Sequence, residues 1–148
     1  MKTQTFEQTI NYSVNTVKNA LNNLFENHKC DFLNVKENSV FNTYSFDKVL
    51  CAYNVSLKEV DENNTLVTIT CSDRSNDNTA YQALDATITR YINEFLNILA
   101  AQLENKPAEE IQNLINANKG QENLAVGTEI ITTIFAIISI IVAVSIFI

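Results

Sequence analysis

Four side chains in this sequence have the chemistry of zinc ligands, namely His28, Cys30, Cys51 and Cys71. Structural zinc usually takes four nitrogen or sulfur ligands arranged as a tetrahedron. If Cys51 and Cys71 lie on one face of neighbouring strands, they are opposite or diagonal to each other. The close cysteine spacing that pre-forms zinc sites is absent, and free cysteines commonly pack as small apolar side chains. We therefore predict buried cysteines and no metal site.

Another candidate metal site is a stretch rich in side-chain oxygen atoms that resembles the start of a calcium-binding loop. Asp73, Ser75 and Asp77 alternate along the chain as the first ligands of such a loop do. The glycine expected at the sixth position is Asn78, and the acid expected at the twelfth is Leu84. We therefore expect the three oxygen-bearing side chains to accept hydrogen bonds from the amides of a turn and a helix start.

Catalytic chemistry has little support in the residues. A nucleophile needs a nearby base and an orienting group, and neither can be assigned around His28, the one histidine. Glu7, Asp85 and Glu94 are at positions from which a carboxylate could reach an interior, although such acids more often face solvent. The sequence has no glycine-rich phosphate loop. We expect no enzymatic activity and no cofactor.

Aromatic side chains are the strongest candidates for a binding site. Rings with polar tips suit a mixed pocket between a sheet and a long helix, whereas ordinary core packing is the competing interpretation. The candidate ligand-binding residues are Tyr44, Tyr53, Tyr81, Tyr91 and Phe95, accompanied by Phe41 and Phe46.

The elements that would position these residues follow from apolar periodicity. Residues 3–12 alternate as a strand, and Ser13 is a plausible cap for an amphipathic helix that follows it. Four further strands are predicted at residues 31–36, 39–46, 49–57 and 65–71. The run 39–46 would place Val40, Tyr44 and Phe46 on one side. A hairpin turn at residues 60–64 would pair Leu57 with Val67.

A second, longer helix follows the strands. Thr79 and Gln82 fit a capping box, and a wide apolar stripe runs over residues 84–103. Pro107 ends this helix or starts a shorter one that stops near Gly120. The predicted fold class is α+β, with an antiparallel sheet in the order β-α-β-β-β-β-α and two helices on one face.

This element order, the segment KEVDENNTLVTITC at residues 58–71 and the long closing helix resemble the helix-grip superfamily. That superfamily includes START lipid-transfer domains and polyketide-cyclase-like (SRPBCC-type) proteins. The resemblance covers residues 3–103 and implies an apolar ligand held between the sheet and the long helix. This chain is shorter, with five recognisable strands, so we expect a filled core rather than a roomy cavity.

Residues 130–148 read IITTIFAIISIIVAVSIFI, with no charged side chain, glycine or proline. As a helix this segment would be roughly 28 Å long, close to the ~30 Å hydrocarbon core of a bilayer. We therefore expect three parts: a helix-grip-like domain at residues 1–104, a helical stalk and linker at 105–129, and a transmembrane helix at 130–148.

Small residues recur along one face of the predicted membrane helix. Thr132, Ala136, Ser139 and Ala143 are spaced by four, three and four residues, which would let two helices approach closely and form a homodimer. Six of the nineteen residues in this segment are Ala, Ser or Thr, so chance is an alternative explanation.

Charge and cysteine content limit the partners and the compartment. The net charge of −7 and the scattered basic residues argue against nucleic acid. Three cysteines without a CxxC pair favour a reducing compartment. The first ten residues hold no apolar run of signal-peptide length, so we expect a single-pass protein whose soluble domain faces the cytosol.

Two function classes follow from this reading. The favoured one is a tail-anchored membrane protein with a non-enzymatic binding or scaffolding domain. The alternative is a membrane-tethered carrier of a lipid or another apolar ligand. They differ in whether an open cavity lies beneath the helix at residues 84–103.

Overall fold

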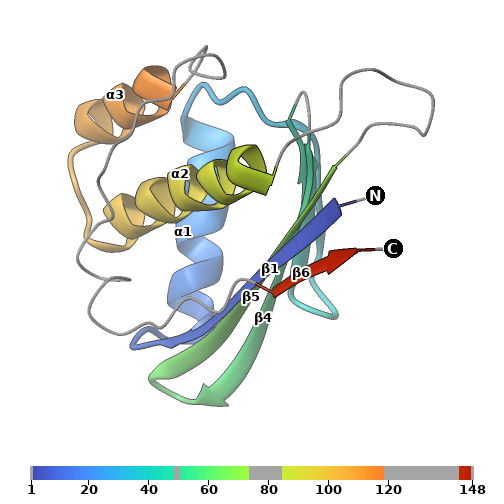
Figure 1. The fold of residues 1–148 in the computed structure, drawn as a ribbon. Coiled ribbons are helices and arrows are strands. Elements are labelled where there is room, and N and C mark those ends of the chain that lie inside the picture. Colours follow the sequence, from blue (N-terminus) through green and yellow to red (C-terminus); the bar gives the residue numbers. More distant parts are fainter. Residues whose placement is uncertain (1, 49–50, 74–84, 119–143, 148) are drawn as a thin grey trace.

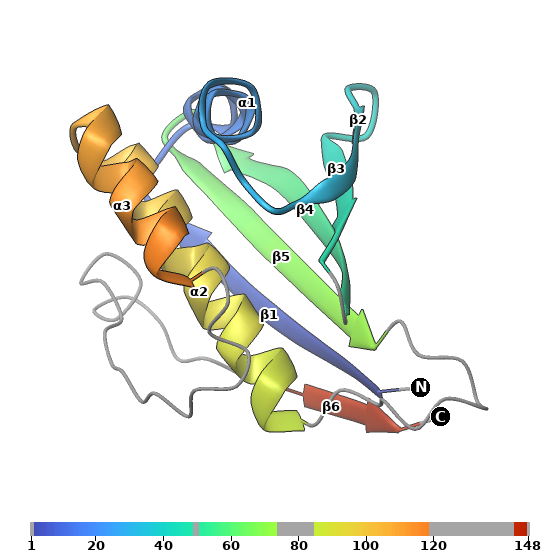
Figure 2. The same ribbon diagram turned by 90° about the horizontal axis from the view of Figure 1, so that it is seen from above.

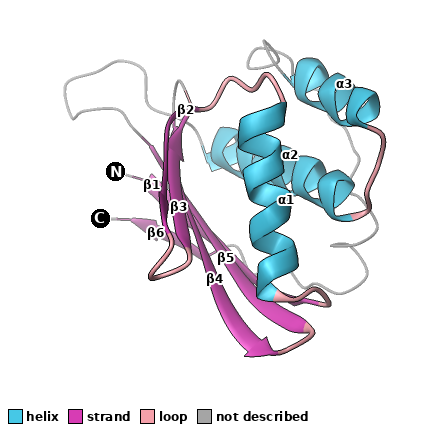
Figure 3. Ribbon diagram, turned by 180° about the vertical axis from the view of Figure 1, so that it is seen from behind, coloured by secondary structure: helices cyan, strands magenta, loops and turns pink. Residues whose placement is uncertain are grey.

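A computed structural model describes residues 2–48, 51–73, 85–118 and 144–147. Helices α1 and α2 lie on the same face of a twisted antiparallel sheet, and α3 lies beyond α2 (Figures 1, 2 and 3). The predicted α+β class and the predicted order of the first seven elements are therefore confirmed. The strands are β1 Lys2–Ile10, β2 Leu33–Asn38, β3 Thr43–Asp47, β4 Cys51–Asp61, β5 Asn64–Asp73 and β6 Val144–Phe147; the helices are α1 Val14–Asn27, α2 Asp85–Leu103 and α3 Ala108–Asn118.

The strands follow the order β2-β3-β4-β5-β1-β6 across the sheet, and every neighbouring pair is antiparallel. The β4–β5 hairpin places Leu57 opposite Val67, so the predicted register is confirmed. Both residues are buried, and a shift of one residue would turn the apolar side of each strand toward solvent. The hydrophobic pattern therefore fixes this pairing.

The two faces of the sheet have opposite chemistry. Alternate residues of β1, β4 and β5 are buried under the helices, whereas the intervening residues are mainly Thr, Ser and Asn. On this outer face the Thr3 and Ser72 hydroxyls lie 3.0 Å apart, and the Thr68 hydroxyl donates to Glu7 at 3.2 Å. Such a division is typical of an antiparallel sheet with one face packed and one face solvated.

Helix α1 begins where its sequence indicates. The Ser13 hydroxyl accepts a hydrogen bond from the Thr16 amide at 3.1 Å, which confirms the predicted cap. Val17, Leu21 and Leu24 then follow at helical spacing and are buried against the sheet and α2. The apolar stripe of α1 therefore seals one side of the core.

The end of α2 is a Schellman motif built on Asn105. This residue has φ 56°, the Lys106 amide donates to the Ala101 carbonyl at 3.1 Å, and the Asn105 amide donates to the Gln102 carbonyl at 3.2 Å. Pro107 comes directly after this motif and before α3, where its carbonyl accepts the first helical hydrogen bond from Ile111. The predicted break at Pro107 therefore separates two helices.

The prediction for residues 39–46 is partly wrong. Strand β3 begins only at Thr43, and Val40, which was predicted to share a face with Tyr44 and Phe46, forms an exposed turn with Phe41 after β2. Asn42 has φ 52°, a conformation that asparagine tolerates better than most residues, and this reverses the chain before β3. The apolar residues of this turn are typical of a strand, so the sequence pattern predicted a strand there.

The C-terminal segment also differs from the sequence expectation where it is described. Val144–Phe147 form β6, which pairs with β1, whereas a helix was predicted over residues 130–148. The outer edge of β1 offers backbone hydrogen-bonding groups that an extended segment can satisfy. Residues 119–143, with Thr132, Ala136, Ser139 and Ala143, lie outside the described residues. No described helix is long and apolar enough to cross a bilayer.

Candidate functional site

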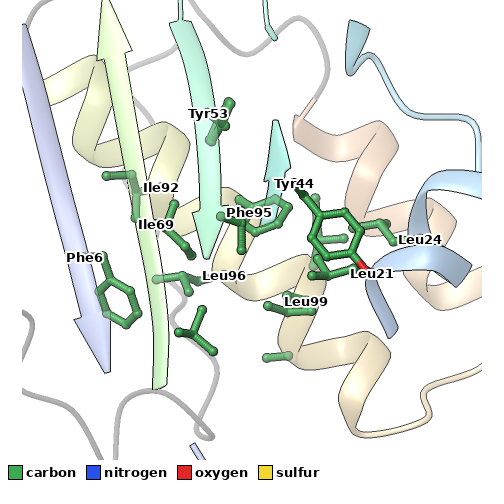
Figure 4. Close-up of a cluster of buried hydrophobic side chains, with 14 of the residues drawn as sticks. Phe6, Leu21, Leu24, Tyr44, Tyr53, Ile69, Ile92, Phe95, Leu96 and Leu99 are labelled. Atoms are coloured by element: carbon green, nitrogen blue, oxygen red, sulfur yellow. The ribbon is translucent and has the colours of Figure 1, made fainter. Parts of the chain in front are cut away.

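Buried aromatic and aliphatic side chains, among them Tyr53, Phe95 and Ile69, pack together between α2 and the sheet (Figure 4). Phe46 of β3 and Tyr53 of β4 stack with 4.7 Å between their ring centroids and 16° between their planes. Phe95 of α2 lies 5.2 Å from Phe46, measured between centroids, and all three side chains are buried. Phe25 and Phe32 add rings at 5.1 and 4.8 Å from Phe46. These distances are those of favourable aromatic contacts in a close-packed core.

Tyr44 joins this aromatic cluster at the side nearest α1. Its hydroxyl donates a hydrogen bond to the Asn22 side-chain carbonyl at 3.2 Å. Burial, reinforced by the negative charge of Glu37, raises the pKa of Tyr44 to about 12. Burial also raises the pKa of Tyr53 well above its ordinary value. Both phenols therefore remain protonated near neutral pH and cannot act there as bases.

Tyr91 lies in a cluster of charged side chains next to these rings, since both Tyr91 and Glu94 act electrostatically on Tyr53. The Lys48 ammonium is 4.6 Å from the centre of the Tyr91 ring, and the Arg90 guanidinium is 5.4 Å from it. Lys48 also pairs with Glu94 at 3.4 Å and with Asp31 at 3.8 Å, while Arg90 pairs with Glu94 at 3.7 Å. Two cations therefore lie over one phenol ring, and two carboxylates pair with these cations.

The central member of this ionic cluster is Lys48, which was not predicted from the sequence. Lys48 is 4% exposed although it follows the last residue of β3, and its backbone pairs with that of Cys51. A signal was available, because Tyr44, Phe46 and Lys48 continue the period-two alternation of the buried face. The charge of Lys48 concealed that pattern.

The predicted ligand-binding residues thus lie in two neighbouring environments. Tyr44, Tyr53 and Phe95 lie together in the aromatic core, Tyr91 lies in the ionic cluster, and Tyr81 is outside the described residues. Phe41, which accompanied them in the sequence analysis, is 70% exposed and contributes nothing to this core. The buried members of the set are therefore explained by packing.

The cysteines are arranged as small core side chains. Cys51 and Cys71 are buried on adjacent strands and are diagonal to each other, since Cys51 pairs with Asp73 and Cys71 with Tyr53. A hydrogen bond with the Cys51 thiol, together with burial, raises the pKa of Cys71, so this thiol is a poor nucleophile. Cys30 donates to the Leu24 carbonyl at 3.6 Å.

The described residues contain no preassembled metal site. No group of three or more His, Cys, Asp or Glu side chains converges there to hold a metal ion. His28 is the C-cap residue of α1, and Asp73 is a buried residue at the end of β5. Ser75 and Asp77, the other members of the calcium-like stretch, lie outside the described residues.

A polar groove between α1 and the end of α2 was not predicted. It encloses about 250 Å³ and is partly open to solvent. Its walls carry several amide side chains, which the sequence places on two separate helices and which no local motif connects. The lining residues are Tyr12, Thr16, Asn19, Ala20, Asn23, Gln102, Leu103 and Asn105.

Among the described residues, the most exposed large apolar side chains form the tip of the β2–β3 hairpin. We define the hairpin tip as Val40 and Phe41, which are 81% and 70% exposed. The Asn38 side chain accepts hydrogen bonds from the amides of both residues, at 3.1 and 3.3 Å. The Asn42 carbonyl accepts from the Leu57 amide at 3.0 Å and ties the turn to β4. The tip is therefore an ordered apolar projection.

Comparison with known proteins adds no relative from which a function could be transferred. No family model matches the chain, and no curated protein is significantly similar to it. Functional inference therefore depends on the residues of this chain and their geometry.

Proposed function

We propose that this chain is a non-enzymatic protein-binding domain held at a membrane by its apolar C-terminal segment. The observation that carries the binding role is the hairpin tip, where Val40 and Phe41 are exposed side by side. Asn38 holds both backbone amides, so the two side chains are presented without a large loss of conformational freedom on binding. The anchoring role is supported by the length and composition of residues 130–148.

The charge around the hairpin tip favours a protein partner over a bilayer surface. Insertion of exposed apolar residues into anionic membranes is normally assisted by clustered Lys and Arg. On β2, on the part of β4 that continues past the tip and on the β4–β5 turn, two lysines are outnumbered by four carboxylates. These exposed residues are Lys36, Glu37, Lys58, Glu59, Asp61 and Glu62. We therefore infer a partner with an apolar socket surrounded by a basic rim.

The helix-grip resemblance belongs to this proposal as the class of the domain. It is supported by an antiparallel sheet with the expected element order and by the long helix α2 across its inner face. The alternative function, an apolar-ligand carrier, has weaker support because aromatic rings occupy the space where such a ligand would lie. Protein binding at the surface is more compatible with a filled interior.

Photo-cross-linking from the full chain in its native membranes tests the binding role. A photoreactive amino acid at Glu59 lies on β4 near the hairpin tip, and its adducts report what approaches that surface. We expect a discrete protein adduct. Its yield should fall at least about tenfold when Val40→Ser and Phe41→Ser are combined, because the partner then loses its apolar anchor.

Leu33→Ser is the matched control, because Leu33 is a 51% exposed apolar residue at the other end of β2. This variant should retain the protein adduct. An adduct that survives the double substitution would contradict the role of the hairpin tip, and so would adducts formed mainly with phospholipid.

A further inference from the structure

We propose that the outer edge of β1 is a binding site for the chain's own C-terminal segment, and that docking there excludes membrane insertion. Val144–Phe147 and the bilayer would then compete for the same residues. This inference rests on the proposed membrane anchor, since it concerns how that anchor is engaged.

The docked state is the one in the structure. Strand β1 pairs on one side with β5 and on the other with β6, so β6 covers part of β1 and is the edge strand on that side of the sheet (Figure 1). The antiparallel register joins Lys2 to Phe147, Thr3 to Ile146 and Thr5 to Val144. Val, Ile and Phe are all residues that favour strands, and the segment carries no charge. The sequence of β6 is therefore suited to completing a sheet edge.

The lengths of the two states make them exclusive. Residues 130–148 contain nineteen apolar or small residues, enough for a helix of roughly 28 Å. If Val144–Phe147 remain in β6, residues 130–143 supply only fourteen, or roughly 21 Å as a helix. A hydrocarbon core is ~30 Å thick, and Glu129 limits extension in the other direction. Spanning the bilayer therefore requires β6 to leave β1.

Release of β6 changes the surface of the domain. The backbone groups between Lys2 and Thr5 lose their strand partner when β6 leaves. An uncovered strand edge can accept another extended segment by backbone pairing. Membrane insertion would therefore make β1, in place of β6, the strand that is open to pairing at the sheet edge opposite the one formed by β2.

An engineered disulfide in the full chain tests this exclusion. Thr3→Cys with Ile146→Cys places two thiols at a paired position of β1 and β6, and Cys30→Ser removes the partly exposed native thiol. Thr9→Cys with Ile146→Cys is the matched control, because Thr9 lies at the far end of β1. We expect an intramolecular disulfide in the first variant and at least tenfold less in the control.

Flotation with phosphatidylcholine vesicles then separates the possible outcomes. The reduced variant should float with the vesicles, and the oxidised variant should float at least tenfold less. Equal flotation of both forms would overturn the exclusion while leaving the anchor intact. A disulfide without flotation of the reduced form would instead contradict the membrane anchor. Failure to form the disulfide without vesicles would overturn docking.

Hydrogen exchange of the unmodified full chain supplies a readout that needs no substitution. Backbone amides of Lys2–Thr5 that pair with β6 should exchange at least tenfold faster after vesicle insertion. The β1 amides that pair with β5 should keep their protection. Unchanged exchange at the β6 side in vesicle-bound protein would overturn the proposed release.

Discussion

Lys48 shows how one buried charge connects distant elements of this fold. It follows β3, yet its ammonium contacts Glu94 and Tyr91 of α2 and lies 3.8 Å from Asp31. A buried ammonium is tolerated because carboxylates and an aromatic face replace its water. The side chain therefore fixes the end of the β3–β4 hairpin against the long helix.

Replacing Lys48 with Ala should lower the free energy of unfolding by roughly 3 kcal/mol, because Glu94 then loses a buried partner. Arg90 still lies 3.7 Å from Glu94 and limits the loss. Urea unfolding of the full chain in nonionic detergent measures the effect. Lys58→Ala, at an exposed position of β4, should change the value by less than about 0.5 kcal/mol. Equal effects of the two variants would contradict a structural role for the ionic cluster.

At the scale of elements, alternation and capping residues were sufficient for much of the fold. Ser13 begins α1, and the clear alternation before Leu57 produced both β4 and its register with Val67. The β2–β3 turn was missed because Val40 and Phe41 extend an apolar pattern that continues into Tyr44. Only the backbone conformation of Asn42 and the hydrogen bonds to Asn38 distinguish a turn there.

The junction between α2 and α3 gives a prediction at this scale. Asn105 is held at φ 56°, where glycine has no steric penalty and alanine has a considerable one. Asn105→Gly should leave stability unchanged or slightly higher, whereas Asn105→Ala should cost about 1 kcal/mol. Thermal unfolding of both variants beside Asn113→Ala, on the exposed face of α3, checks this order. If alanine is tolerated as well as glycine, the Schellman motif does not control the helix end.

At the scale of the whole molecule, the sequence predicted a candidate site in the interior, whereas the structure favours one on the surface. Most of the aromatic residues that suggested a ligand pocket belong to the core, because rings from β3, β4 and α2 pack directly against one another. Sequence alone cannot separate these outcomes, since a lined pocket and a packed core use the same residue types. The hairpin tip and the β1 edge emerged only when exposure and strand pairing were known.

The C-terminal segment illustrates the same limit. Residues 130–148 are apolar over a length that a helix would need to span a bilayer. The same apolar, β-branched composition also suits a strand. Pairing of Val144–Phe147 depends on the free edge of β1, which is created by residues far away in the sequence. A local pattern therefore could not reveal this strand.

The proposed membrane anchor is tested most directly by vesicle flotation of the full chain with two charges placed in the apolar segment. Each Arg at the centre of a membrane helix costs about 2.5–3.5 kcal/mol, so Ile137→Arg with Ile140→Arg should reduce flotation at least about a hundredfold. Asn113→Arg with Ala117→Arg adds the same charge at exposed positions of α3 and should float as the unmodified chain does. Equal flotation of the two double variants would contradict a membrane-held domain.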